Sequence, residues 1–266
     1  METLGITNSD IIRFLLVFFR TGAVLFTAPI FGSKNIPPRV RIVLACTIAI
    51  VLTMSAVADR AEAAAIALNA SLFAGNRLLV MAVIQEMFLG IAIGYTARLT
   101  FTAVQMAGQL VGMGMGFSMA RIMDPSTREN VMLVAQYNTI VTTLIFLLIH
   151  GHHYVLMAIS DSFSAIPLAG WRPSASLMEH LDNVFAGVFN TGLRIAIPVM
   201  GAGFLAKVGL AIIARTMPQM NVFIVGLPIQ IAIGLLAMAV SLPFFVKMLH
   251  LMFASMNENM WIIFRQ

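Results

Sequence analysis

The chain has 266 residues, of which 60% are hydrophobic and 10% are charged, and its mean hydropathy is +0.94. Soluble domains carry about 25% charged residues, so this composition excludes an ordinary soluble domain and predicts a single integral membrane unit. The net charge of +5 comes from basic residues scattered singly along the chain, which argues against nucleic-acid binding. A lone cysteine, Cys46, excludes an internal disulfide framework and a cysteine-based zinc site.

The first half of the chain contains three apolar segments separated by polar turns. They occupy residues 11–31, 42–58 and 78–123, and the last ends at Asp124 and Pro125, because proline cannot continue a helix interior. The second segment ends in SAVAD, which resembles a signal-peptidase site. It lies unusually far into the chain and follows another apolar stretch, so we expect a retained helix.

The second half contains further apolar segments at residues 131–149, 184–215 and 222–250, and the first of these continues through the histidines to residue 160. The longest predicted loop of this half is 161–183. A membrane span needs about 20 apolar residues, so hydropathy predicts about six to eight helices. Lipid permits only helices or closed barrels, and these segments lack the alternation of barrel strands. The sequence therefore predicts an all-α integral membrane protein. Four prolines (198, 218, 228 and 243) are expected to break the helices of its last third.

Seven charged residues fall inside these apolar segments, and each would cost about 2.5 kcal/mol or more at the centre of a bilayer. They are Arg13, Arg20, Glu86, Arg98, Arg194, Lys207 and Lys247. So many charges indicate surfaces covered by protein or water, as in a component of a larger membrane assembly. Arg13 and Arg20 lie two turns apart on one helix face. We interpret Glu86 as a buried partner of one of the arginines rather than as a proton relay, since carriers show several coordinated ionisable groups.

The stretch AGQLVGMGMGFSMARIMDP, residues 107–125, is the least usual part of the sequence. Small residues recur every fourth position, a pattern that lets another helix approach closely; they are Gly108, Gly112, Gly116 and Ala120. The same stretch also offers flexible apolar side chains beside pliable backbone, which describes a deformable seal. The candidate seal comprises Gly112, Met113, Gly114, Met115, Gly116, Phe117 and Met119. Helix packing and sealing both remain open at this point.

Three histidines, His150, His152 and His153, follow one another at a predicted helix end. Three adjacent rings rarely reach one tetrahedral site, and no nearby carboxylate or cysteine completes it, so the sequence favours an interfacial helix end over a metal site. Motifs for nucleophilic, phosphate-binding or metallopeptidase chemistry do not occur. The sequence therefore predicts no enzyme, no catalytic residue and no cofactor.

A polar turn lies between the last two apolar segments and contains Arg215, Pro218 and Asn221. Asn221 can start the next helix as its N-cap. A capped hairpin turn and a contact with a partner protein are compatible interpretations of this turn.

Four motifs in one order carry a family resemblance: AGQLVGMGMGFSMARIMDP, GHH followed by SFSAIPL, GLRIAIPV, and ARTMPQMNVFIVGLP. Together they resemble the FliR family of flagellar biosynthesis proteins, subunits of the type III export gate whose counterparts in injectisomes are the SctT proteins. The resemblance spans nearly the whole chain, and the run ARTMPQMNVF is its most specific part.

The resemblance implies a fold of broken helical hairpins, with a FliP-like part at residues 1–204 followed by a FliQ-like hairpin and tail at 205–266. It implies a helical gate assembly with FliP and FliQ in the flagellar basal body of the inner membrane, largely above the bilayer plane. FlhB, FlhA, membrane lipid and the exported flagellar subunits are the further implied partners. The family's plug loop maps onto about residues 108–123, facing methionines of FliP, with Asp124 and Pro125 as its anchor. The charged and turn residues would then serve partner interfaces or buried pairs: Arg13, Arg20, Glu86, Arg98, Arg215, Pro218 and Asn221.

Three alternatives stay open beside this expectation. The chain could be an injectisome gate subunit, or a purely structural subunit with no pore contact. A secondary transporter or small-solute channel would need polar groups that converge on broken helices and an internal repeat, and the sequence shows neither clearly.

Overall fold

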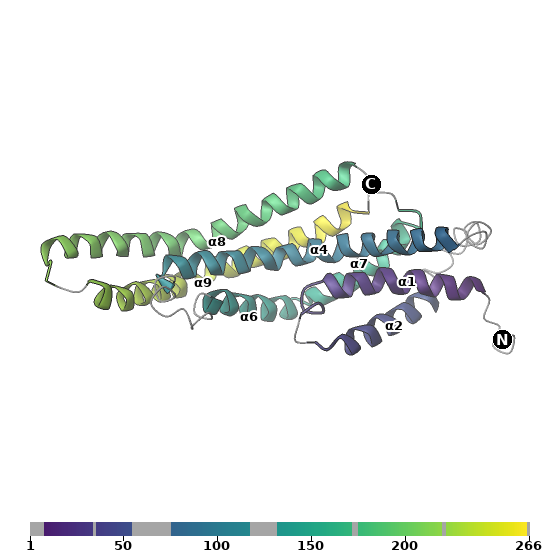
Figure 1. Ribbon diagram of the computed structural model, residues 1–266, viewed down its shortest axis with the longest axis horizontal. Helices are drawn as coiled ribbons and strands as arrows, with labels where there is room; N and C mark the ends of the chain where they lie inside the picture. The colour runs from purple at the N-terminus through teal and green to yellow at the C-terminus, as the bar shows by residue number, and fades with distance from the viewer. Residues whose placement is uncertain are drawn as a thin grey trace. The chain divides into compact units, whose positions relative to one another are not determined.

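The computed structural model describes residues 8–33, 36–54, 76–117, 132–171, 175–219 and 222–264. In these residues the regular structure is helical, and strands do not occur (Figure 1). The helices are α1 (Asn8–Thr27), α2 (Pro38–Met54), α4 (Asn76–Gly114), α6 (Met132–Leu148), α7 (Gly151–Ala165), α8 (Ala175–Thr216) and α9 (Val222–Ile262). The all-α prediction is confirmed.

Three helices, α4, α8 and α9, are long and apolar enough to cross a membrane. The consecutive helices α6 and α7 make a fourth candidate if they form one broken span. At about 1.5 Å per residue, the 42 residues of α8 extend about 63 Å, twice the hydrocarbon thickness of about 30 Å. Helices of this length continue well beyond the hydrocarbon core.

Two details of the predicted helices are corrected by the structure. The loop expected at residues 161–183 is shorter, because α7 continues to Ala165 and α8 begins at Ala175. Glu179 and Asp182 lie exposed on α8, so the polar residues there mark a solvated helix face and not a loop.

The prolines also behave differently from the expectation. Pro198 lies inside α8, and Pro228 and Pro243 lie inside α9, so both helices continue through them, whereas Pro218 lies in the turn between the helices. A proline removes one backbone hydrogen bond, and in helices of about forty residues the remaining bonds maintain the helix on both sides.

Contacts divide the chain into two units, each with its own core. Unit 1 comprises Met1–Arg98, His150–Val184 and Ser255–Gln266. In it, α1 and α2 form an antiparallel hairpin (Figure 1). Helix α1 approaches α4 so closely that a Cβ atom on Gly90 would lie 2.5 Å from the carbonyl oxygen of Arg20.

Unit 2 comprises Leu99–Ile149 and Phe185–Ala254. An aromatic cluster joins α4, α6 and α9 here: the ring centroids of Phe101, Phe146 and Phe253 lie 5.2 to 6.0 Å apart. Such spacing is typical of favourable aromatic pairs. The sequence-based division at residues 204 and 205 stays a prediction, and α8 runs without interruption through both residues.

Candidate functional site

The Gly/Met stretch lies at the C-terminal end of α4, in unit 2. Residues 108–114 are helical, and the helix ends at Gly114. Gly116 follows with φ +87°, a conformation that side chains with a Cβ atom rarely adopt. The segment expected as a loop from Gly108 onward therefore begins as helix, and the chain leaves α4 at residues 115–116. The remaining predicted site residues of this stretch, Met119, Ala120, Asp124 and Pro125, lie outside the described residues.

The small residues of α4 meet neighbouring backbones directly. A Cβ atom on Gly108 would lie 2.4 Å from the Cα atom of Ala135 on α6. A Cβ atom on Gly203 of α8 would lie 2.9 Å from the carbonyl oxygen of Gly114. Such close backbone approach is the function of small residues in helix packing. Gly112, whose place in the stripe is between Gly108 and Gly116, is buried as well.

The methionines of the stretch lie in different environments. Met115 is fully buried, and its Cγ atom would be 2.4 Å from a Cβ atom on Gly234 of α9. Met113 is 47% exposed, and Phe117 is half-buried. Of the two methionines of this stretch that the structure describes, Met113 is the one that another molecule can contact without any rearrangement of the chain.

An apolar cavity of about 560 Å³ lies beside the end of α4, between α4, α6, α8 and α9 of unit 2. Val111 and Phe117 of the Gly/Met region contribute to its wall. Its described lining residues carry no formal charge, and the polar ones are Tyr137, Asn138 and Ser241. Among the residues that the structure describes, the cavity therefore shows no convergent charged groups of the kind that a transporter of ionic solutes requires.

A buried ion pair forms the polar centre of unit 1. Arg20 of α1 donates from Nε and Nη2 to the carboxylate of Glu86 on α4, the second bond at 3.0 Å, and both side chains are at most 1% exposed. Glu86 is thereby the partner of an arginine, and that arginine is Arg20. A bidentate geometry of this kind is favoured for burying a guanidinium with a carboxylate.

The other side of the same guanidinium fixes the end of α7. Nη1 of Arg20 donates to the carbonyl oxygens of Ser162, at 3.0 Å, and Ile166, at 3.1 Å. The guanidinium also lies 4.3 Å from the ring centroid of Phe163, and the backbone N–H of Ala169 donates to Glu86 Oε1 at 2.7 Å. These hydrogen bonds satisfy the buried guanidinium and carboxylate, so the pair connects α1, α4 and the turn after α7.

The other predicted interface residues that the structure describes differ from Arg20 and Glu86 in exposure. Arg13 is half-buried on α1, and Arg98, Arg215 and Pro218 are exposed. Asn221 lies outside the described residues. The remaining charges of the apolar segments are exposed too: Arg194, Lys207 and Lys247.

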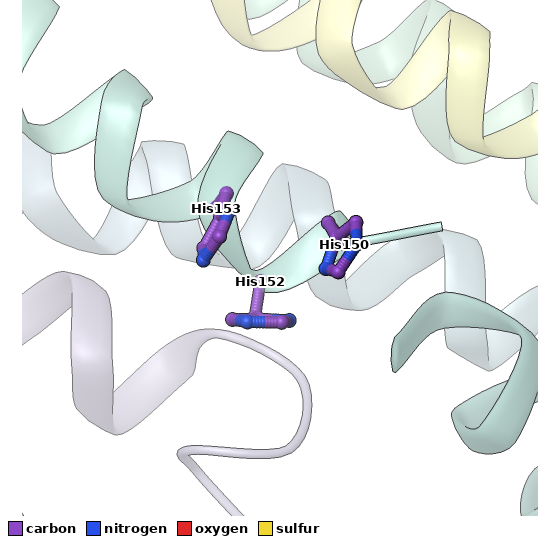
Figure 2. Close-up of side chains that lie close together, drawn as sticks. All are labelled: His150, His152 and His153. Carbon is purple, nitrogen blue, oxygen red and sulfur yellow. The ribbon is translucent and has the colours of Figure 1, made fainter. Parts of the chain in front are cut away.

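Sequence reasoning missed the residues that face the Gly/Met stretch from α8 and α9. Gly203 and Gly234 supply the close approaches described above, and Gln230 Oε1 would lie 2.6 Å from a Cβ atom on Gly116. No local pattern marks them, because their partners are about ninety to one hundred and twenty positions away along the chain. The side chains of His150, His152 and His153 also lie closer together than the sequence analysis expected, as Figure 2 shows.

The fold and these features define an all-α, multi-pass membrane protein whose packed Gly/Met helix end adjoins an apolar cavity. The profile of the family described as "Bacterial export proteins, family 1" matches residues 11–256. The chain belongs to this family.

The chain is similar to several curated proteins over most of their length. The chain is 30% identical over 250 residues to the flagellar biosynthetic protein FliR of Bacillus subtilis (strain 168), covering 93% of this chain and 92% of the relative. It is 31% identical over 233 residues to FliR of Aquifex aeolicus (strain VF5), covering 88% and 86%. It is 28% identical over 244 residues to FliR of Escherichia coli (strain K12), covering 90% and 89%.

The chain is therefore a FliR-type component of the flagellar export apparatus, in which it associates with other proteins of that apparatus. It is a multi-pass protein of the bacterial inner membrane, in the flagellar basal body.

Proposed function

We propose that this chain forms, together with FliP and FliQ, a closed pore through which unfolded flagellar subunits are exported. In this proposal the end of α4 is the part of the chain that seals the pore. The supporting observation is that α4 ends just before Met115 and that Gly116 then has a positive φ. This break in the helix lies between the exposed Met113 and the following residues, and Met115 within it is buried. Such a seal requires a short apolar segment whose backbone can change conformation, and a segment that is helical at one end and non-helical at the other meets this requirement.

The chemistry of the seal follows from its side chains. An apolar constriction blocks ions because water leaves it, and it does so without any charged gate. Thioether side chains adapt to surfaces of different shape, so Met113, Met115, Phe117 and Met119 can close around a passing polypeptide of any sequence. Gly116, already in the left-handed region, is the hinge best supported by geometry, and Gly112 and Gly114 lie in the last turn of the helix. Asp124 and Pro125 are proposed as the anchor that joins the seal to the following helix.

The helix lengths and charges support assembly with partners. Arg98, Arg194 and Lys207 are exposed on long apolar helices, and exposed charges of this kind are costly in lipid. FliP and FliQ, with FlhB and FlhA beside them, are the proposed proteins that cover or hydrate these helices. Recovery of the chain from native membranes as a monomer free of these proteins would contradict this part of the proposal.

A stiffened seal gives a direct test. Gly112 and Gly114 are helical, and Gly→Ala at a helical position stabilises the helix by about 0.5–1 kcal/mol. Alanine at Gly116 instead disfavours the left-handed φ of +87°, at a cost of about 1 kcal/mol. The three changes together favour a continuous helix by about 2–3 kcal/mol, a population shift of about thirty- to a hundredfold. We expect the triple variant to accumulate in the membrane and to secrete far less flagellin. Deletion of residues 112–119 is expected instead to make the membrane permeable to ions.

The matched control replaces Gly201 and Gly209 on α8 with alanine, since a Cβ atom at either position has open space. This control is expected to secrete normally. A purely structural role of the Gly/Met stretch, which the close approaches of Gly108 and Gly114 favour, predicts no ion leak from the deletion in cells that still assemble the gate. Normal secretion by the triple variant, with no leak from the deletion, would refute the sealing role.

A further inference from the structure

The first turn of α7 brings three imidazole rings together. His150 precedes the helix in the left-handed conformation, with φ 57° and ψ 31°, while His152 and His153 lie within its first turn. The backbone N–H of His153 donates to the carbonyl oxygen of His150 at 2.8 Å, which closes this turn. Because the backbone at His150 reverses direction, its ring lies beside the others instead of pointing away along the chain (Figure 2).

The distances between the rings are short enough for shared coordination. The centroids of His152 and His153 are 4.4 Å apart, and those of His150 and His153 are 5.4 Å apart. One ring nitrogen from each histidine lies within 4.8 Å of the other two. In a tetrahedral site, two nitrogens that each lie about 2.0–2.1 Å from Zn²⁺ are about 3.3–3.4 Å apart. The ring nitrogens, which lie within 4.8 Å of one another, therefore approach by up to about 1.4 Å when side-chain rotation completes the geometry.

The rings are also free to make this adjustment. His150 and His153 are exposed, and His152 is half-buried. Nδ1 of His152 is buried and, within the described part of the chain, has no hydrogen-bond partner. A buried ring nitrogen without a partner is unfavourable, and a metal ion would satisfy it if His152 coordinates through Nδ1.

We propose that His150, His152 and His153 bind one divalent transition-metal ion of the zinc class. Three neutral imidazoles with an open fourth position suit Zn²⁺, Cu²⁺, Ni²⁺ and Co²⁺, whereas Mg²⁺ and Ca²⁺ require oxygen ligands. The site lies at the positive end of the α7 dipole, which weakens the binding of a cation, but this effect is small beside three coordination bonds. The bound ion ties the left-handed residue His150 to the helix that follows it.

Zn²⁺ itself is the probe for this site. The tag-free, full-length chain in detergent is titrated with Zn²⁺ in competition with a chromophoric chelator, and one ion per chain is expected. Loss of one ligand costs more than the roughly 10–100-fold loss seen on removal of an outer-shell partner, so His150→Gln, His152→Gln and His153→Gln are each expected to weaken binding at least about tenfold. Zn²⁺ is also expected to raise the unfolding temperature of the wild-type chain and not that of these variants.

His250→Gln is the matched control, because His250 is exposed on α9 and lies outside the group. It is expected to bind Zn²⁺ as the wild-type chain does. The absorption spectrum of bound Co²⁺ distinguishes a tetrahedral site from loose octahedral association, and circular dichroism shows whether each variant is folded. Equal Zn²⁺ affinity in the wild-type chain and the folded triple variant, or an octahedral Co²⁺ spectrum, would overturn the proposal. Because Zn²⁺ binding is measured on the isolated chain, its outcome is separate from that of the pore proposal.

Discussion

Replacing Glu86 with glutamine is expected to lower the free energy of unfolding by about 3–5 kcal/mol, because it leaves the guanidinium of Arg20 buried without a counter-charge. Arg20 is 0% exposed and has no route to water in the folded chain. The change also weakens the hold on the turn after α7, since Ala169 donates to the same carboxylate. The expected result is a strong fall in the amount of folded protein in the membrane and loss of motility, measured by thermal unfolding in detergent and by swimming assays.

Two variants separate the loss of the ion pair from other effects of the change. Glu179→Gln removes an exposed carboxylate on α8, and exposed charges contribute about 0–1 kcal/mol, so it is expected to behave as wild type. The double variant Arg20→Met with Glu86→Leu removes both charges, so no unpaired guanidinium is buried. The carbonyl oxygen of Ile166 and the N–H of Ala169 lose their partners in it, so only a partial recovery of stability relative to Glu86→Gln is expected. A double variant no more stable than Glu86→Gln would contradict the cost assigned to the unpaired charge.

Replacing Gly108 with valine is expected to be the most damaging change in the Gly/Met stretch. The first added carbon would lie 2.4 Å from the Cα atom and 2.9 Å from the backbone nitrogen of Ala135. Backbone atoms cannot rotate away, so α4 and α6 must separate along their contact. Overpacking typically costs about 1–3 kcal/mol, and a clash with backbone belongs at the upper end of that range. Thermal unfolding of the purified variant measures this loss.

Gly187→Val on α8 is the corresponding control, because a Cβ atom there has nothing within 4 Å. It changes the same residue type to the same side chain in a helix of similar hydropathy. An equal loss of stability in both variants would show that the cost arises from helix propensity and not from the approach of α4 to α6.

The fold could be predicted largely from hydropathy, because each helix is an apolar run that begins and ends near a polar or proline-containing turn. Segments predicted at 131–149 and from residue 222 agree closely with α6 (Met132–Leu148) and the start of α9 (Val222–Ile262). The predicted loop at residues 161–183 was wrong in part, because polar residues occur on exposed helix faces as well as in loops. Glu179 and Asp182 were interpreted as loop residues, but on a helix longer than the membrane is thick they simply face water.

The candidate site could be predicted only on one side. The stripe of small residues in α4 predicts that another helix packs against it, but it does not predict that the contacting residues are Ala135, Gly203 and Gly234. Those pairings depend on tertiary structure. The histidines illustrate the same limit, since their convergence depends on the left-handed backbone of His150, which periodicity does not predict.

The most direct test of the sealing role is site-specific cross-linking from Met113. A Cys46→Ser background removes the chain's single natural cysteine, and Met113→Cys then places the reactive group on the 47% exposed position of the stretch. Met178→Cys, at a 64% exposed position on α8, serves as the control. In cells with an export substrate stalled in the apparatus, position 113 is predicted to cross-link to that substrate, and in resting cells to FliP. Substrate cross-links from position 178 but none from position 113 would contradict the account.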